Sequence, residues 1–108
     1  MRLEDLLTEL DITEWRGDAS VDITSVVQDA SAAGPGSLFC CIRGSRVDGH
    51  DFAAAAVERG ASAVMCERYV NVPPSVPQVR VTDTRAAVGP AAAAVQGHPS
   101  RSMTVVGI

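Results

Sequence analysis

The feature that most constrains this chain is a series of short apolar runs separated by turns and by helical patterns. Residues 38–42 (LFCCI) and 61–66 (ASAVMC) are largely apolar segments of strand length with polar or glycine-containing neighbours. Runs of this kind are typical of strands covered on both faces, as in α/β sheets. Because helical patterns alternate with them along the 108 residues, we expect a small single α/β domain with a central sheet flanked by helices.

The same periodicities predict the remaining strands and an opening helix. An apolar stripe at helical spacing is formed by Leu3, Leu6, Leu7 and Leu10. Residues 21–27 and 79–81 read as strands, and the apolar run at 103–106 predicts a last strand. Trp15 is expected to be a core residue or a packing residue without ligand contact.

Two further helices have recognisable ends. Asp51 is expected to cap a helix that Gly60 stops in a left-handed conformation. Asp83 or Thr84 is expected to cap a second, alanine-rich helix. The Gly-Pro pair at 89–90 interrupts that helix, which is therefore kinked or begins again at the proline.

Charge and hydropathy exclude several classes of partner. With 13 acidic residues against nine basic ones, the formal charge of -4 offers no basic field for nucleic acid. No apolar run approaches the roughly 18 residues that suggest a membrane span. Residues 1–10 do not resemble a signal peptide, so we expect a cytoplasmic protein without membrane contact.

The cysteines and histidines read as structural residues. Cys40, Cys41 and Cys66 have no CxxC spacing, so neither a disulfide framework nor a metal site is expected, and we predict reduced, buried thiols. His50 and His98 have no nucleophile or carboxylate arrangement that reads as a catalytic triad. With no long amphipathic surface to spare, a monomer is expected.

Three motifs, in order, resemble the amino-terminal domain of the Mur ligase family. The first is PGSLF at 35–39, which is similar to the family's turn into a strand. The second is GSRVDGHDF at 44–52 followed by AVERGA at 56–61, which is similar to the family's G-x-x-x-DGHDF…A-x-x-x-GA segment. The third is GHPS at 97–100 followed by TVVGI at 104–108, which is similar to the linker and strand before the family's phosphate loop. Together they cover nearly the whole chain from residue 21, and their order and spacing make the resemblance specific.

The resemblance implies two parts and a function. Residues 1–102 would bind the UDP part of UDP-N-acetylmuramoyl-L-alanyl-D-glutamate, and residues 103–108 would be the first strand of a truncated ATP-binding central domain. The parent would be an ATP-dependent amide-bond-forming ligase that adds the third peptide residue, meso-diaminopimelate or L-lysine, in peptidoglycan biosynthesis. Its central and C-terminal domains would supply ATP and Mg²⁺ binding and select the amino acid, so the fragment alone would hold no cofactor and no catalytic residue and would be inactive.

Two other functions stay open. The first is the corresponding domain of the family member that adds D-alanyl-D-alanine, although the GHPS linker and the following strand favour the third-residue ligase. The second is a non-catalytic module of the same fold that has lost nucleotide binding.

The resemblance also places the precursor contacts on two loops. The contacting residues would be Gln28, Ala30, Ser31, Ser45, Arg46 and Val47. Both loops follow predicted strands, and open α/β sheets collect ligands at the carboxyl ends of their strands. Amide and hydroxyl groups suit a uracil edge, and Arg46, the only cation in the two loops, suits a diphosphate.

One motif departs from the family pattern. Where the family has Asp-Ser-Arg, this chain has Asp29-Ala30-Ser31, so the hydroxyl moves by one residue and the arginine is missing. Either the backbone of Ala30 makes the contact or the site is weaker than usual. In the second loop, Asp48 is expected to hold the loop shape by accepting hydrogen bonds from nearby N–H groups.

Overall fold

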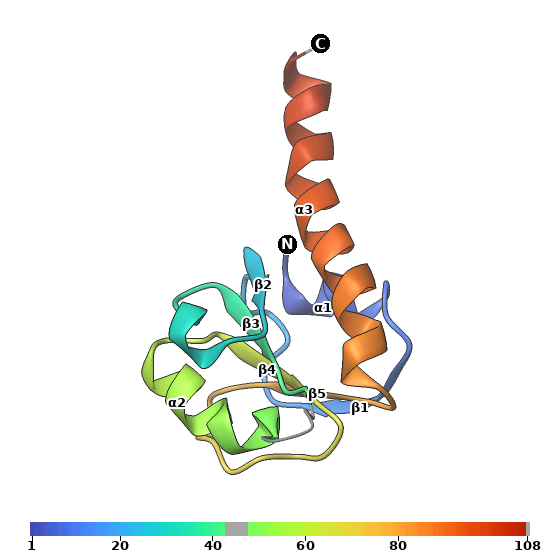
Figure 1. Cartoon of the computed structure of the whole chain (residues 1–108). Coiled ribbons are helices and arrows are strands. Elements are labelled where there is room, and N and C mark those ends of the chain that lie inside the picture. Colours follow the sequence, from blue (N-terminus) through green and yellow to red (C-terminus); the bar gives the residue numbers. More distant parts are fainter. Residues whose placement is uncertain (43–47, 108) are drawn as a thin grey trace.

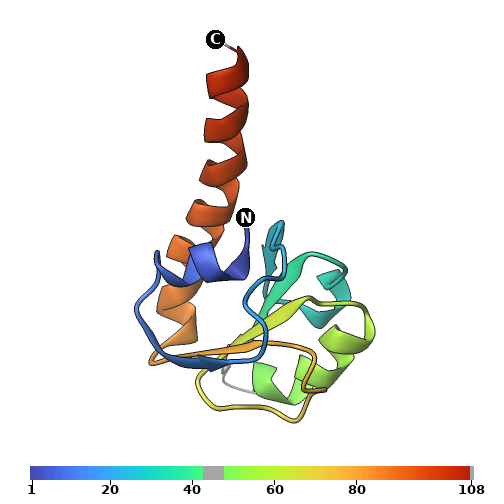
Figure 2. The ribbon, with the colours of Figure 1, turned by 180° about the vertical axis from the view of Figure 1, so that it is seen from behind.

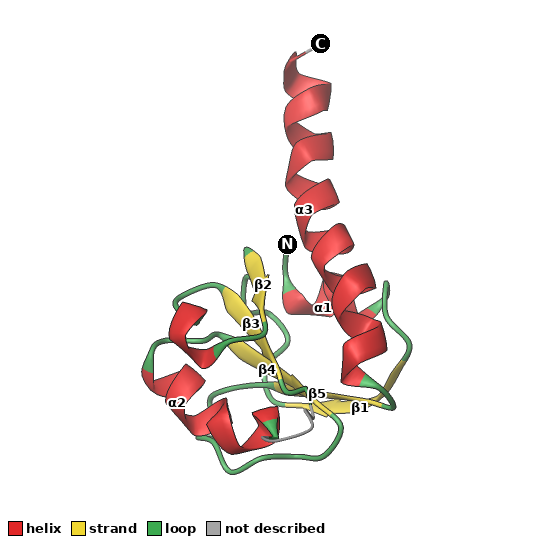
Figure 3. Cartoon of the chain, in the orientation of Figure 1, coloured by secondary structure: helices red, strands yellow, loops and turns green. Residues whose placement is uncertain are grey.

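Five strands form one mixed sheet in the computed structural model, which describes residues 1–42 and 48–107, with side chains to residue 96. In spatial order the strands are β1 (Ile12–Arg16), β5 (Gln78–Val81), β4 (Ala63–Cys66), β3 (Ser37–Cys40) and β2 (Ser25–Val27). Strands β2 to β5 are parallel, and β1 pairs antiparallel with β5. The expected central sheet flanked by helices is confirmed (Figure 3).

Helices cover the sheet on both faces. Helices α1 (Leu3–Leu7) and α3 (Thr84–Gly107) lie on one side, and α2 (Ala53–Glu58) lies on the other (Figures 1 and 2). Two short 3-10 turns, η1 (Ala30–Ala32) and η2 (Gly49–Phe52), contact α2. The result is three layers with a hydrophobic core on each side of the sheet.

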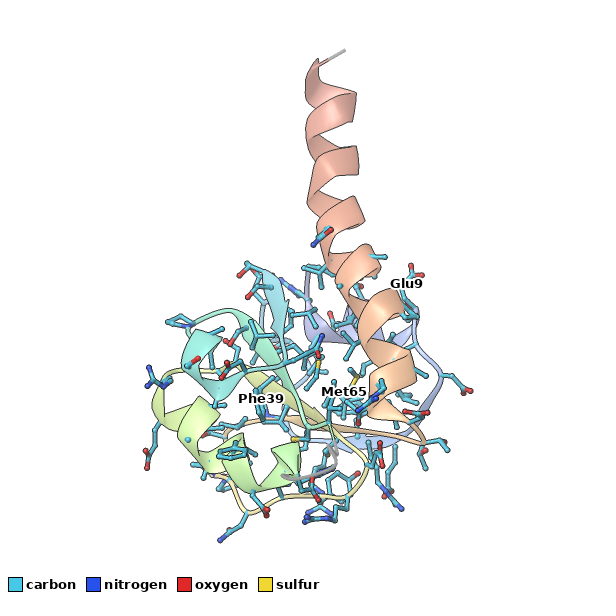
Figure 4. All side chains as sticks on the ribbon, in the orientation of Figure 1. Glu9, Phe39 and Met65 are labelled. Carbon is cyan, nitrogen blue, oxygen red and sulfur yellow. The ribbon has the colours of Figure 1, made fainter. Side chains whose placement is uncertain are left out.

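Alternate residues of the central strands enter different cores. Leu38 and Met65 pack with α1 and α3, whereas Phe39 and Val64 pack with α2. Figure 4 shows Phe39 and Met65 on these two sides. Because every residue of β3 and β4 is buried, both strands lack a polar face, as their apolar runs predict.

Several predicted helix ends are confirmed. Leu3, Leu6 and Leu7 of the opening stripe are buried. Gly60 follows α2 with a φ of 105°, a left-handed conformation that glycine adopts without a Cβ penalty. At the start of α3, the Asp83 carboxylate accepts a hydrogen bond from the Ala86 N–H at 3.2 Å. This is the capping role expected of Asp83.

The edge strand β1 is absent from the sequence prediction, and the core position, one of the two roles expected for Trp15, is wrong. Four of the five residues of β1 are exposed, and Trp15 is 44% exposed. A strand with a single neighbour, β5, buries little side-chain area and therefore shows no clear apolar alternation. Its position depends on pairing with a segment more than sixty residues away, as the Trp15–Val79 partnership shows.

The strand predicted at 21–27 is shorter than expected. Only Ser25–Val27 pairs in the sheet, because the neighbouring strand β3 begins at Ser37, the partner of Ser25. The preceding residues bond to the start of the chain instead: the Ile23 N–H donates to the Met1 carbonyl at 2.6 Å. Ile23 is nevertheless fully buried, which accounts for the apolar pattern.

The helix predicted to start at Asp51 starts differently. Asp48 is the N-cap of η2, where its carboxylate accepts from the His50 N–H at 3.0 Å, and α2 follows from Ala53. An Asp carboxylate that accepts a hydrogen bond from the N–H two residues ahead, as that of Asp48 does, favours a tight turn. Asp51 therefore lies within η2 rather than before a helix, and it is exposed.

Helix α3 is longer and more continuous than predicted. It passes through Gly89 and Pro90 without a break; both are exposed, while Ala91 and Val95 pack in the core. Residues 103–106, predicted as a strand, belong to the same helix. In the described part of the chain no strand lies beside them, and a helix satisfies its own backbone hydrogen bonds. Their assignment to a second domain stays a prediction.

We predict that the three cysteines resist thiol reagents in the folded protein. Cys40, Cys41 and Cys66 are free and fully buried. Burial raises the pKa of Cys40 to about 12 and that of Cys66 to about 11, and it raises the pKa of Cys41 as well. Since the thiolate is the reactive species, labelling by an aromatic disulfide reagent at pH 8 should be slow in native buffer and fast in urea. Equal rates in the two conditions would contradict this prediction.

Candidate functional site

A hollow of about 340 Å³ lies where β2 and β3 end. It is lined by Gln28, Asp29, Ala30, Phe39, Ile42, Gly49 and Phe52. The first three follow β2 directly, Ile42 follows β3, and the last two belong to η2. Its position at the carboxyl ends of parallel strands is the usual ligand position in open α/β sheets.

The first wall of the hollow is the turn at Asp29. The Asp29 carboxylate accepts from the Ser31 N–H at 2.9 Å and caps η1. This hydrogen bond is the main cause that lowers the Asp29 pKa. Ala30 lines the hollow, whereas Ser31 is exposed and does not. The departure from the family motif therefore leaves the hydroxyl of residue 31 outside the hollow.

The second wall is closed by a backbone contact between Ile42 and Gly49. The Gly49 N–H donates to the Ile42 carbonyl at 2.8 Å. A Cβ on Gly49 would lie 2.6 Å from the Ile42 nitrogen, so this approach excludes any side chain. The predicted contact residues Ser45, Arg46 and Val47 lie between these two positions and outside the described residues.

Asp48 is held by three groups around the second wall. One carboxylate oxygen accepts from the backbone N–H of His50 and lies 2.6 Å from His50 Nδ1. The other accepts from Arg68 at 3.2 Å. The backbone and ring hydrogen bonds from His50 are the main causes that lower the Asp48 pKa to about 2. The predicted role of Asp48 in holding the loop is consistent with these contacts.

Phe52 and Phe39 are site residues that the sequence prediction missed. Phe39 is buried beneath the hollow, and Phe52 is 43% exposed at its rim. Phe52 follows a predicted loop and ends the DGHDF segment. An aromatic residue next to a predicted ligand-binding loop was a signal that could have indicated Phe52 as a lining residue. The hollow thus combines an amide, backbone groups and an aromatic ring.

A hollow of about 490 Å³ beside His50 has one carboxylate, Asp51, and one cation, Arg68, whereas two other hollows in the described part of the chain are more acidic. One of about 380 Å³ is bordered by Glu67, Asp83 and Arg85. Another of about 350 Å³ is bordered by Glu9, labelled in Figure 4, and by Asp11 and Asp83. Two or more carboxylates in each oppose an anionic ligand, whereas the hollow beside β2 and β3 has a single carboxylate among its lining residues.

Within the described residues, no group of three or more His, Cys, Asp or Glu side chains could hold a metal ion. The same residues include no helix long and apolar enough to cross a membrane.

Comparisons with known proteins agree on one family. The family model described as "Mur ligase family, catalytic domain" matches residues 22–103. The whole chain matches 22% of a UDP-N-acetylmuramoyl-L-alanyl-D-glutamate–2,6-diaminopimelate ligase of Bacillus licheniformis at 38% identity, and 22% of the ligase of the same name from Geobacillus thermodenitrificans at 41%. Among solved structures, 82% of the chain matches 19% of MurF from Acinetobacter baumannii, with a TM-score of 0.73 and 26% identity.

The chain thus spans about a fifth of the length of these curated relatives.

We predict that Asp48 makes the fold more stable above pH 4 than below it. A group whose pKa is lower in the folded state stabilises that state above its unfolded pKa, and this contribution is lost as the pH falls towards about 2. Urea unfolding at pH 6 and pH 2.5 should show that Asp48→Asn loses about 1–2 kcal/mol less on acidification than the wild type. Equal losses would mean that other carboxylates account for the acid sensitivity.

Proposed function

The chain belongs to the Mur ligase family, and from this premise we propose that it binds the UDP part of UDP-N-acetylmuramoyl-L-alanyl-D-glutamate. The parent would be a cytoplasmic, ATP-dependent ligase that adds the third residue of the peptidoglycan peptide. The relatives named above at 38% and 41% identity carry 2,6-diaminopimelate in their names, which favours that amino acid over L-lysine.

One observation carries the proposal: the hollow at the ends of β2 and β3 joins the two loops that the family resemblance selects. Gln28 and Ala30 line it directly. Ile42 and Gly49, which flank residues 43–48, line it as well. A ligand in this hollow would therefore contact the first loop and lie next to both ends of the second.

We place the uracil ring in the hollow, beside the exposed ring of Phe52. An aromatic face stacks on any base, and the Gln28 amide offers both a donor and an acceptor for the uracil edge. The backbone of Ala30 takes the contact that a serine would make in the usual motif. The diphosphate then points towards residues 45–47, where Arg46 would supply a charge-assisted hydrogen bond.

The contribution of this domain to the reaction is positioning. Binding energy at the UDP end, remote from the reacting glutamate carboxylate, orients that carboxylate in the complete enzyme. ATP with Mg²⁺ would activate the carboxylate for attack by the incoming amine. Neither a metal-binding group nor a glycine-rich phosphate loop occurs in the described residues, so we assign that chemistry to the central and C-terminal domains of the parent.

The D-alanyl-D-alanine-adding ligase is the second candidate, because the structural match is to MurF. The identity of 26% to that structure is lower than the 38–41% to the third-residue ligases. Both enzymes would bind a UDP-muramoyl peptide, so the UDP site does not separate them. Ligase assays of the parent protein with diaminopimelate and with D-alanyl-D-alanine would do so.

We predict that the chain binds UDP and that Arg46→Ala weakens this binding about tenfold or more. A hydrogen bond from a cation to a phosphate contributes roughly 1.5–3 kcal/mol in a partly desolvated site, and 1.4 kcal/mol corresponds to a tenfold change. Isothermal calorimetry with UDP measures the dissociation constants.

Arg2→Ala is the matched control, because Arg2 is an exposed arginine that pairs with Asp22, before the start of β2, and does not line the hollow at the other end of that strand. Its removal should not affect the affinity. Equal affinity of Arg46→Ala and wild type would exclude the diphosphate role of Arg46. Failure of the wild type to bind UDP would favour the non-catalytic module instead.

We also predict that Phe52→Ala weakens binding of uridine and UDP by a similar factor, about tenfold, whereas Phe52→Tyr preserves the affinity. Base–aromatic stacking contributes about 1–3 kcal/mol per base, and tyrosine keeps the ring. Because the Phe52 ring is 43% exposed, its removal should have little effect on the fold.

Trp15→Ala provides the control for loss of an exposed aromatic ring, because Trp15 is 44% exposed on β1, away from the hollow. If Trp15→Ala lowered the affinity as much as Phe52→Ala, the stacking position would be wrong.

A further inference from the structure

His50 is a buried imidazole with hydrogen bonds on both ring nitrogens. The His50 side chain is only 1% exposed. Asp51 and Phe52, which follow it in the same four-residue turn η2, are exposed. Nδ1 lies 2.6 Å from an Asp48 carboxylate oxygen, and Nε2 lies 3.0 Å from the Glu67 backbone nitrogen.

These two contacts define the tautomer. The Glu67 N–H can only donate, so Nε2 must be the acceptor. The ring proton is then on Nδ1, where the Asp48 carboxylate accepts it. The geometry therefore fits the neutral imidazole with its proton on Nδ1.

The contacts also attach η2 to the central sheet. Glu67 follows β4 directly, and its carboxylate accepts from the Thr84 N–H at the start of α3 at 3.1 Å. Arg68, the next residue, donates to Asp48. Two side-chain contacts, from His50 to the Glu67 N–H and from Arg68 to Asp48, thus connect η2 and its cap to the residues that follow β4.

The same turn forms one wall of the proposed nucleotide hollow. Gly49 and Phe52 line the hollow, and His50 lies between them in the sequence but does not line it. His50 borders a different hollow of about 490 Å³, together with Asp51 and Arg68. Any effect of His50 on the nucleotide must therefore act through the residues beside it.

We propose that His50 is a positioning residue: its neutral imidazole holds η2 against β4 so that Gly49 and Phe52 form the wall of the nucleotide hollow. This role adds to the proposed function, and it rests on that function only for the identity of the ligand as UDP. The position of the wall itself depends on this chain's own contacts.

Three substitutions separate the two hydrogen bonds. His50→Asn places an amide nitrogen near the position of Nδ1 and keeps the donor to Asp48, whereas His50→Gln places an amide oxygen near Nε2 and keeps the acceptor for Glu67. His50→Ala removes both. UDP affinity should fall about three- to tenfold in each amide variant and further in His50→Ala.

Val95→Ala is the control for general destabilisation. Val95 is 2% exposed in the core on the opposite face of the sheet, so its truncation should lower stability and leave UDP affinity unchanged. Equal affinity losses in Val95→Ala and His50→Ala would overturn the positioning role. Should His50→Ala fail to fold, the two amide variants provide the same comparison.

Two measurements without ligand separate this proposal from the proposed function. Nitrogen-15 NMR should find the ring proton of His50 on Nδ1. Amide exchange of Gly49, whose N–H donates to Ile42, should become at least tenfold faster in His50→Ala and not in Val95→Ala. If UDP does not bind the wild type, the proposed function fails, and these two results still decide the role of His50. A proton on Nε2, or unchanged Gly49 exchange, would overturn it.

Discussion

Burial of β3 and β4 on both faces determines where this domain can hold a ligand. Each apolar residue of these strands packs either with α1 and α3 or with α2, so neither face of the sheet is open at its centre. The accessible backbone groups lie where the parallel strands end. The layers themselves are held together by the two cores, so the loops at that edge are not needed to join them.

Two aspartates apply the same local geometry on the two sides of the hollow. Asp29 after β2 and Asp48 after β3 each accept from the N–H two residues ahead and each cap a 3-10 turn. The two turns differ in support. The Asp29 carboxylate is exposed and accepts from Ser31, whereas the Asp48 carboxylate also contacts the His50 ring and Arg68. Among the described residues, the capping aspartate of η2 therefore has more hydrogen-bond partners than that of η1.

Local patterns predicted the core of the fold but few of its long-range contacts. The apolar runs identified β3, β4 and β5, and Gly60 and Asp83 marked helix ends, because each signal lies within a few residues of the structure it specifies. The strand β1 was missed because its position depends on β5. In the candidate site, Gln28 and Ala30, which the family motif predicts as contacts, line the hollow, and their contact with a ligand stays a prediction. The contact of His50 with Glu67, seventeen positions away, has no local signature and required the structure.

The pairing of β1 with β5 has a consequence for how the chain folds. The first strand finds its neighbour among residues 78–81, and the Glu14–Arg80 ion pair spans 66 positions. During synthesis, β1 leaves the ribosome first but cannot pair in the sheet until β5, the last strand of the described sheet, has also emerged. Contacts of such sequence separation slow folding, because closing a long loop costs entropy before the contact forms. Nascent chains of this domain should therefore pass through a stage in which β2, β3 and β4 are assembled and β1 has not yet paired with β5.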